Sequence, residues 1–295
     1  MKDMENWVKG IPYEVAFWQS YYGNKKRRAD LFQWSQFDKE CELDNFSVAD
    51  FIKTASGDSE PVILDVGSSL SYMFGNIING KRYDIRYVDA LSPFYNRILD
   101  RYHIDRPHIK FGMLENLSAL FAAESVDLIH VRNALDHCCS PLDGILQALA
   151  VVRKNGVIYL NHHRNEAEGE NYRGFHQFNI DIKNGELIIW NRDTTIDVAD
   201  RLSPYASVEA SFSKDGYVVA VITKRESFSP ETASRLISEA VTFTAGLTEV
   251  LMETQHSATF SLSYHLRRLY CTLGHRTMRL LPYSLLNAIK RLASR

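Results

Sequence analysis

The chain has few cysteines, prolines and glycines, and each shortage excludes a class of protein. Its four cysteines among 295 residues follow neither a disulfide-framework spacing nor a zinc-site spacing. Eight prolines and 15 glycines are too few for a collagen or a low-complexity linker protein. No run approaches the roughly 18 apolar residues that a membrane span needs, and the charged first residues do not suit a signal peptide. We therefore expect a reduced, globular, cytoplasmic protein.

Acidic residues are missing from the end of the chain. None follows Glu253, whereas seven lysines and arginines lie beyond it, although the whole chain has a formal net charge of only −2. The basic residues alternate with leucines over 262–295, which is compatible with peripheral contact with an anionic membrane at its inner face. Packing on the acidic body of the chain, or on a partner protein, is the alternative. An acidic body argues against a general nucleic-acid binder.

Three regions differ in composition. Residues 1–58 are rich in aromatic side chains and predict a helical cap whose rings either pack on the neighbouring domain, which we favour, or form a lid over a site. Residues 59–225 alternate short apolar strands with helical segments, which is typical of an open, mostly parallel α/β sheet. An Asn-Gly turn signal predicts an inserted hairpin at 176–192, and a second hairpin at 207–223 ends this region. Residues 226–295 predict a helical extension.

Small and acidic residues stand at the ends of the first two predicted strands. The first apolar run ends in Gly67-Ser68-Ser69, where small side chains let the backbone approach a ligand. Asp89 ends the second strand, where a carboxylate can accept hydrogen bonds from both ribose hydroxyls of an adenosine-type ligand. A tight turn and a capping aspartate would explain the same residues singly. Together they predict a nucleoside ligand at this edge of the sheet.

Several short motifs follow one another in a fixed order, at 63–68, 87–91, 115–117, 125–129 and 132–137. With the terminal hairpin, they resemble the motifs of class I S-adenosylmethionine-dependent methyltransferases over roughly residues 59–225. The resemblance implies a Rossmann-like seven-stranded sheet that is mostly parallel and ends in an antiparallel hairpin. It also implies S-adenosyl-L-methionine as the cofactor and methyl transfer as the reaction.

The resemblance implies a set of cofactor-binding residues around the ends of the first four strands: Asp65, Gly67, Ser68, Ser69, Asp89, Ala90, Leu114, Glu115 and Asn133. The chain departs from the family at Ser69, where a second glycine is usual, and at Met113, where an acidic residue is common. A non-catalytic scaffold of this fold in a surface-glycan assembly complex is an alternative that would explain Ser69 and the basic tail. A nicotinamide-dependent oxidoreductase is a weaker alternative, because no Gly-x-Gly-x-x-Gly is present.

Histidines and carboxylates cluster where the acceptor would bind. Residues 161–177 are similar to bacterial methyltransferases associated with surface-polysaccharide genes, which implies a hydroxyl of a carbohydrate or related polar metabolite as the acceptor. The candidate bases are His163, His162 and His137, because imidazole accepts protons near neutral pH. Strand alternation sends the first two to opposite faces, and we favour His163. The candidate acceptor-binding residues are Asp136, Asn165, Glu166, His176 and Trp190.

A divalent metal bound by His162, His163, Glu166 and His176 could instead orient a sugar diol. No compact ligand spacing such as His-x-x-x-His supports this, so no metal site is predicted.

Overall fold

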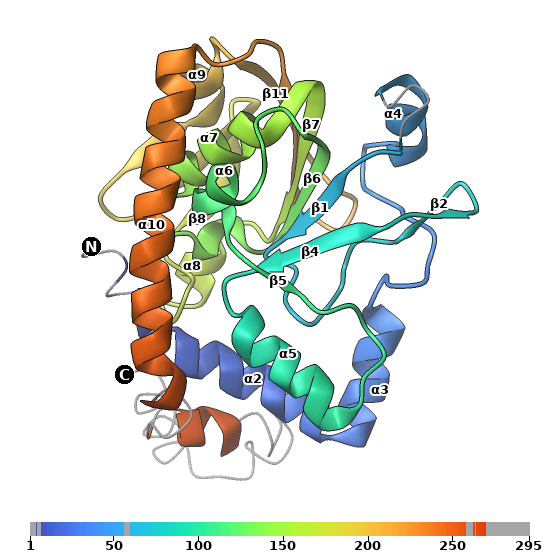
Figure 1. The fold of residues 1–295 in the computed structure, drawn as a ribbon, viewed down its shortest axis with the longest axis vertical. Coiled ribbons are helices and arrows are strands. Elements are labelled where there is room, and N and C mark those ends of the chain that lie inside the picture. Colours follow the sequence, from blue (N-terminus) through green and yellow to red (C-terminus); the bar gives the residue numbers. More distant parts are fainter. Residues whose placement is uncertain (1–3, 5–6, 56–59, 258–261, 263, 270–295) are drawn as a thin grey trace.

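The computed structural model describes residues 4, 7–55, 60–257, 262 and 264–269. A seven-stranded sheet lies at its centre (Figure 1). In spatial order the strands are β11 (Ala206–Phe212), β12 (Val218–Lys224), β7 (Val152–His162), β6 (Val126–Arg132), β1 (Ile63–Val66), β4 (Ile85–Asp89) and β5 (Lys110–Phe111). Strand β12 runs antiparallel to both of its neighbours, and the remaining pairs are parallel. The expected Rossmann-like sheet with a terminal antiparallel hairpin is confirmed.

The central strands are apolar because both of their faces are covered. Every residue of β1 is buried, as are all but the last of β6. Val66 pairs with Val88 of β4 on one side and with Val131 of β6 on the other, and Arg132 pairs with Asn161 of β7. This register brings the carboxyl ends of β4, β1, β6 and β7 to one edge of the sheet.

Helices cover the two faces of the sheet and create two hydrophobic cores. Helices α2 (Ile11–Gly23), α3 (Lys25–Trp34), α4 (Val48–Ala55) and α5 (Ser92–Tyr102) contribute to one core, and α7 (Pro141–Val151) with the short α6 (Leu117–Leu120) contributes to the other. Successive strand residues enter different cores, as Ile63 and Leu64 do. The N-terminal helices therefore belong to the same packed body as the sheet.

One predicted boundary is wrong. Apolar residues at helical spacing over 142–152, followed by Asn155-Gly156, predict a helix that continues to this pair. Instead, α7 ends at Val151 and β7 begins at Val152. Asn155 has φ of 62°, and the register between β6 and β7 shifts at this point. A Cβ on Gly156 would lie 2.7 Å from Val152 Cγ1 and 2.9 Å from the carbonyl oxygen of Asp127. The Asn-Gly pair thus forms an irregularity inside a strand, because the backbone of β6 passes too close for a side chain.

The inserted hairpin consists of β8 (Asn179–Lys183) and β9 (Glu186–Trp190), and β10 (Thr195–Asp197) adds a third strand to form a separate sheet. Its residues Ile180, Leu187 and Ile189 belong to the same core as α7. The hairpin is therefore packed onto the domain. The remaining short elements are β2 (Ile77–Ile78), β3 (Lys81–Arg82), η1 (Leu114–Asn116), η2 (Leu135–His137), α8 (Glu166–Gly169) and α9 (Val198–Leu202).

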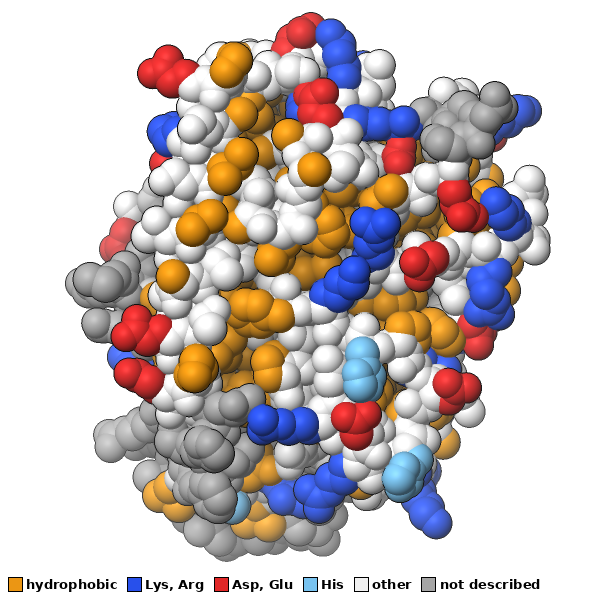
Figure 2. Space-filling view, viewed as in Figure 1, with side chains coloured by type: hydrophobic (Ala, Val, Ile, Leu, Met, Phe, Trp, Pro, Cys, Tyr) orange, Lys and Arg blue, Asp and Glu red, His pale blue; other side chains and the backbone are white. Residues whose placement is uncertain are grey.

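A single long helix, α10 (Pro230–Ser257), crosses the molecule beside α6 and α7 (Figure 1). Ser229 caps its start, since its hydroxyl accepts a hydrogen bond from the Thr232 amide at 3.2 Å. Hydrophobic side chains gather along α10 and the furrow beside it in Figure 2. Among the described residues, no helix has both the length and the apolar character that crossing a membrane requires. Most of the predicted tail contact falls on 270–295, which lie outside the described residues.

Candidate functional site

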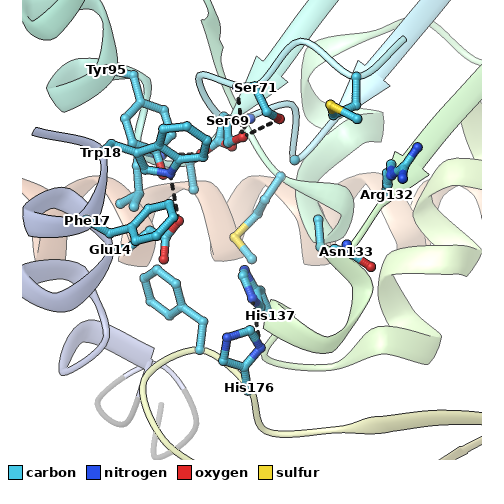
Figure 3. A pocket seen from close by; sticks show the side chains of 18 of the residues that line it. Glu14, Phe17, Trp18, Ser69, Ser71, Tyr95, Arg132, Asn133, His137 and His176 are labelled. Carbon is cyan, nitrogen blue, oxygen red and sulfur yellow. Dashed lines mark hydrogen bonds between the residues drawn. The ribbon is translucent and has the colours of Figure 1, made fainter. Parts of the chain in front are cut away.

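A cavity of about 650 Å³ opens at the carboxyl edge of the parallel strands. Val66, Asp89 and Arg132, at the ends of β1, β4 and β6, line it. Glu14, Phe17 and Trp18 of α2 line the side across from Arg132 (Figure 3). Open α/β sheets bind ligands at this edge. The volume falls within the range of about 300–1,000 Å³ that is usual for cofactor and small-molecule sites. The cavity is large enough for a cofactor and an acceptor together.

The loop after β1 approaches the cavity through a glycine. Gly67 has φ of 70°, and its amide donates a hydrogen bond of 2.8 Å to the carbonyl oxygen of Val88. A Cβ at this position would clash with the Cβ of Ala134, in the segment after β6. Only glycine therefore allows the end of β1 to lie this close both to the end of β4 and to the segment after β6.

Asp89 joins this loop to the end of β4. Its Oδ2 accepts a hydrogen bond from the Ser69 amide at 3.0 Å, and its Oδ1 accepts one from the Leu91 amide at 2.8 Å. Burial raises the pKa of Asp89 to about 7, although these two N–H groups act in the opposite direction. A carboxylate has about four lone-pair positions, so further donors can still bind it.

Ser69 occupies the left-handed region, with φ of 47°, which glycine adopts more readily than serine. Its hydroxyl lies 2.9 Å from that of Ser71 (Figure 3), and the Ser71 hydroxyl in turn donates to the carbonyl oxygen of Ser68 at 3.1 Å. These contacts fold the Ser69 side chain back onto its own loop. The serine is thus accommodated, although it still lines the cavity.

Most residues predicted to bind the cofactor line this cavity, namely Gly67, Ser69, Asp89, Ala90, Leu114 and Asn133. Ser68, Asp65 and Glu115 are buried and do not line it. Asp65 Oδ1 lies 2.7 Å from His130 Nδ1, so its carboxylate faces β6. Glu115 Oε1 accepts hydrogen bonds from the Cys139 and Ser140 amides, at 2.7 and 3.2 Å, just before α7. The structure gives Asp65 and Glu115 partners inside the protein.

The two adjacent histidines differ sharply in surroundings. His162 is 1% exposed, neither of its ring nitrogens has a hydrogen-bond partner among the described residues, and burial lowers its pKa to about 3. It does not line the cavity, so the structure gives no support to a role as base. His163 does line the cavity, with its ring against that of Tyr217 at 4.4 Å. Partial desolvation in the cavity and the nearby Arg132 lower the pKa of His163, which keeps the imidazole neutral at neutral pH.

Asp136, His137 and His176 form a tight cluster beside the cavity. Asp136 Oδ2 lies 2.7 Å from His176 Nδ1 and 3.5 Å from His137 Nε2, and the two ring nitrogens are 3.2 Å apart. Burial alone would raise the pKa of Asp136, but the two imidazoles hold it at about 2. Burial would lower the pKa of His176, but its hydrogen bond to Asp136 raises it to about 9. The histidines line the cavity and Asp136 lies behind them.

Of the other residues predicted to bind the acceptor, one lines the cavity and two do not. Glu166 lines the cavity, and burial together with the Asp136 carboxylate raises its pKa to about 7. Asn165 and Trp190 do not line it: the indole of Trp190 donates a hydrogen bond of 3.1 Å to Asn165 Oδ1. Trp190 therefore packs within the hairpin region, and stacking against a sugar in this cavity is not supported.

Sequence reasoning missed the contribution of the N-terminal helices. Tyr13, Glu14, Phe17 and Trp18 of α2 line the cavity, and Trp18 Nε1 donates a hydrogen bond of 2.7 Å to Glu14 Oε1 (Figure 3). The sequence favours packing over a role as a lid for these aromatics, so none of them is among the predicted site residues. No spacing distinguishes a ring that packs from a ring that walls a cavity, because both are half-covered apolar surfaces. The only available signal was the density of aromatics in one short segment.

No protein-family model and no curated protein sequence matches the chain. Solved structures match the chain with low sequence identity and low TM-scores. The 16S rRNA N2 G1207 methyltransferase RsmC of T. thermophilus, in complex with AdoMet and guanosine, is 14% identical over 63% of this chain and 41% of its own, with a TM-score of 0.36. The CurJ carbon methyltransferase is 12% identical over 59% and 51%, with a TM-score of 0.39.

A SAM-dependent methyltransferase of Thermotoga maritima, described as a possible histamine N-methyltransferase, is 12% identical over 71% of this chain and 99% of its own, with a TM-score of 0.39. The chain thus spans about half or less of the length of the first two structures. Their substrates are diverse, and likenesses at this level assign none of them to this chain.

Proposed function

We propose that this protein is an S-adenosylmethionine-dependent methyltransferase whose acceptor is a hydroxyl of a carbohydrate or a related polar metabolite. The observation that carries the proposal is the position of Asp89. Its buried carboxylate ends the second parallel strand, lines the cavity and holds the loop that follows the first strand. An acidic residue at this position, beside a glycine turn, is suited to the ribose hydroxyls of an adenosine group.

The residues around the cavity fit this cofactor. Gly67 brings the backbone to the cavity without a side chain, and Asp89 retains capacity for hydroxyl donors. Phe17, Trp18 and Tyr95 form an aromatic wall, and aromatic faces attract cations such as a sulfonium. When bound, S-adenosylmethionine would supply a methyl group already activated on sulfur. The protein is left to position the acceptor and remove its proton.

His163 supports a hydroxyl acceptor. Its imidazole is neutral at neutral pH and lines the cavity, so its ring can accept the hydroxyl proton while the acceptor oxygen keeps the electron pair. The His163 amide donates a hydrogen bond of 2.8 Å to Asn133 Oδ1, which fixes the backbone that carries the ring. The Tyr217 ring restricts the imidazole from one side.

Support for a carbohydrate acceptor comes from other side chains that line the cavity. Glu166 and Glu170 offer acceptors for its hydroxyls. The resemblance of 161–177 to methyltransferases associated with surface polysaccharides points to the same class of acceptor.

Calorimetric titration of the full chain with S-adenosylmethionine and with S-adenosylhomocysteine tests the cofactor site. Micromolar binding of either is expected. If folded protein binds neither, the methyl-transfer proposal fails and the non-catalytic scaffold becomes the better explanation.

A panel of sugars and other polar metabolites, with S-adenosylhomocysteine formation as the readout and mass spectrometry of the product, then tests the acceptor. Formation of a methyl ether is expected. Methylation only at nitrogen or carbon would refute the hydroxyl assignment.

A further inference from the structure

We propose that Asp136, His137 and His176 form a binding site for one divalent transition-metal ion at the wall of the cavity. The three ligand atoms come from two segments of the chain, because His176 follows Asp136 by 40 residues and His137 by 39. The potential ligand atoms all lie within 4.8 Å of one another. In Figure 3, His137 and His176 lie together at the end of the cavity away from Ser69 and Ser71.

The spacing of these atoms suits a metal ion. Metal–nitrogen and metal–oxygen bonds are about 2.0–2.2 Å long, which separates neighbouring ligand atoms by about 2.8–3.6 Å in octahedral or tetrahedral geometry. The observed separations of 2.7, 3.2 and 3.5 Å span nearly the same range. A point about 2.1 Å from all three atoms lies about 1 Å outside their plane, as a metal does above one face of its ligands. The site therefore needs little rearrangement to accept an ion, which would displace the proton that His176 Nδ1 now shares with Asp136 Oδ2 and release it to solvent.

The surrounding contacts hold the three side chains in place. The Trp7 indole donates a hydrogen bond of 3.0 Å to the carbonyl oxygen of His137, and the Gln177 amide donates one of 3.2 Å to that of Asp136. The second bond ties together the two segments that supply the ligands. Phe175 stacks on Trp7 at 4.7 Å and approaches the His137 ring at 5.5 Å. Such support orients metal ligands before the ion arrives.

Buried polar groups also point to a ligand here. Asp136 is 2% exposed, and its Oδ1 has no hydrogen-bond partner among the described residues. Glu166 Oε2, in the same cavity wall, is likewise buried without a partner in the described part of the chain. An unpaired buried carboxylate oxygen is costly, and a bound cation would compensate part of that cost.

The donor set indicates the class of metal. Two imidazole nitrogens and one carboxylate oxygen suit Zn²⁺, Co²⁺, Fe²⁺ or Mn²⁺, whereas Ca²⁺ and Mg²⁺ prefer oxygen ligands throughout. Three protein ligands leave coordination positions open, as catalytic metal sites do. Because both histidines line the cavity, the open positions face the space in which an acceptor would lie. Two neighbouring oxygens of a polar acceptor could fill them; this role, unlike the metal site itself, rests on the proposed methyl transfer.

Titration of the chelator-treated full chain with Co²⁺, followed by visible absorption, tests the site, and calorimetry with Zn²⁺ gives the stoichiometry. We expect about one ion per chain and the d–d bands of a protein-bound Co²⁺. His137→Gln and His176→Gln should each weaken binding by at least about 100-fold, since even the loss of a supporting contact costs 10- to 100-fold. These histidines are only partly buried, so their variants are expected to fold, and circular dichroism checks this.

His108→Gln is the matched control. His108 also pairs with an aspartate, Asp100, at 2.9 Å, but both side chains are more than half exposed and lie outside the cavity. This variant should bind Co²⁺ as the wild type does. If the wild type binds no ion at micromolar concentration, or if His137→Gln and His176→Gln bind it unchanged, the proposal is overturned and the cluster is an ion pair only.

The cofactor titration, repeated in the presence of chelator, separates this inference from the proposed function. S-adenosylmethionine binding by a chain that binds no metal would overturn the metal site alone. Metal binding by a chain that binds neither S-adenosylmethionine nor S-adenosylhomocysteine would overturn methyl transfer and leave the metal site standing.

Discussion

Cofactor affinity should depend on pH through Asp89. Its pKa of about 7 means that at pH 6 only about one carboxyl in ten is ionised, whereas at pH 8 about nine in ten are. The ionised form is the better acceptor for two ribose hydroxyls while it also holds the Ser69 and Leu91 amides. We therefore expect S-adenosylmethionine to bind about tenfold more weakly at pH 6 than at pH 8, or about 1.4 kcal/mol.

The variant Asp89→Asn should remove this dependence and weaken binding at pH 8. An amide has one acceptor oxygen, so its NH₂ group would face one of the two backbone N–H groups that Asp89 now accepts. Loss of charged hydrogen bonds costs about 1–3 kcal/mol, which corresponds to a Kd about 5- to 150-fold higher. Asp84→Asn is the matched control, because Asp84 is exposed, precedes the same strand and does not line the cavity.

Calorimetry at pH 6, 7 and 8 and constant ionic strength provides the measurement. Repeating it in buffers with different ionisation enthalpies counts the protons released on binding. Glu166, whose pKa is also about 7, lines the same cavity, so any pH dependence that survives in Asp89→Asn belongs to it or to the ligand. The reasoning is refuted if wild-type affinity is the same from pH 6 to pH 8 and Asp89→Asn binds as tightly as Asp84→Asn.

Further predictions concern the base, the glycine turn and one buried charge. His163→Gln should lower turnover by about 10²–10⁴-fold while cofactor affinity is unchanged, and undiminished turnover would remove it as the base. Gly67→Ala should lower the free energy of unfolding, measured in urea, by about 1–3 kcal/mol. Gly80→Ala is the control: Gly80 has φ of 75° and nothing lies near a Cβ there, so this substitution adds only backbone strain and should lower the free energy of unfolding less. Glu124→Gln should destabilise by about 1–2 kcal/mol, since Lys224 is 1% exposed and contacts this half-exposed carboxylate at 3.0 Å. An unchanged urea midpoint would show that Lys224 does not need the negative charge of Glu124, since its Nζ also donates a hydrogen bond of 2.8 Å to the carbonyl oxygen of Val152.

The features that were predictable from the sequence are local. An apolar run such as 62–66 has to be covered on both faces, and a glycine followed by small residues at its end has few structural uses besides a tight turn. Asp89 ends its strand at a position set by the same local pattern. These residues lie where the pattern indicated, because neighbours in the sequence decide their geometry.

The features that were not predictable depend on where side chains point. Asp65 and Asp89 both belong to parallel strands, yet Asp65 turns to His130 and Asp89 to the cavity. Glu115 faces the turn before α7 because the backbone amides of that turn are the donors nearest to it. Sequence spacing carries no record of which donor a carboxylate will meet.

By itself, the sequence determined the class of fold, the turn at Gly67 and the strand end at Asp89. The periodic burial of apolar residues and the conformational freedom of glycine are properties of short segments, so they can be read without coordinates. Only the tertiary structure decided that α2 walls the cavity, that His162 is buried while His163 is not, and that His176 meets Asp136. Those contacts join segments far apart in the chain, and the packing of the two cores, rather than any local preference, brings them together.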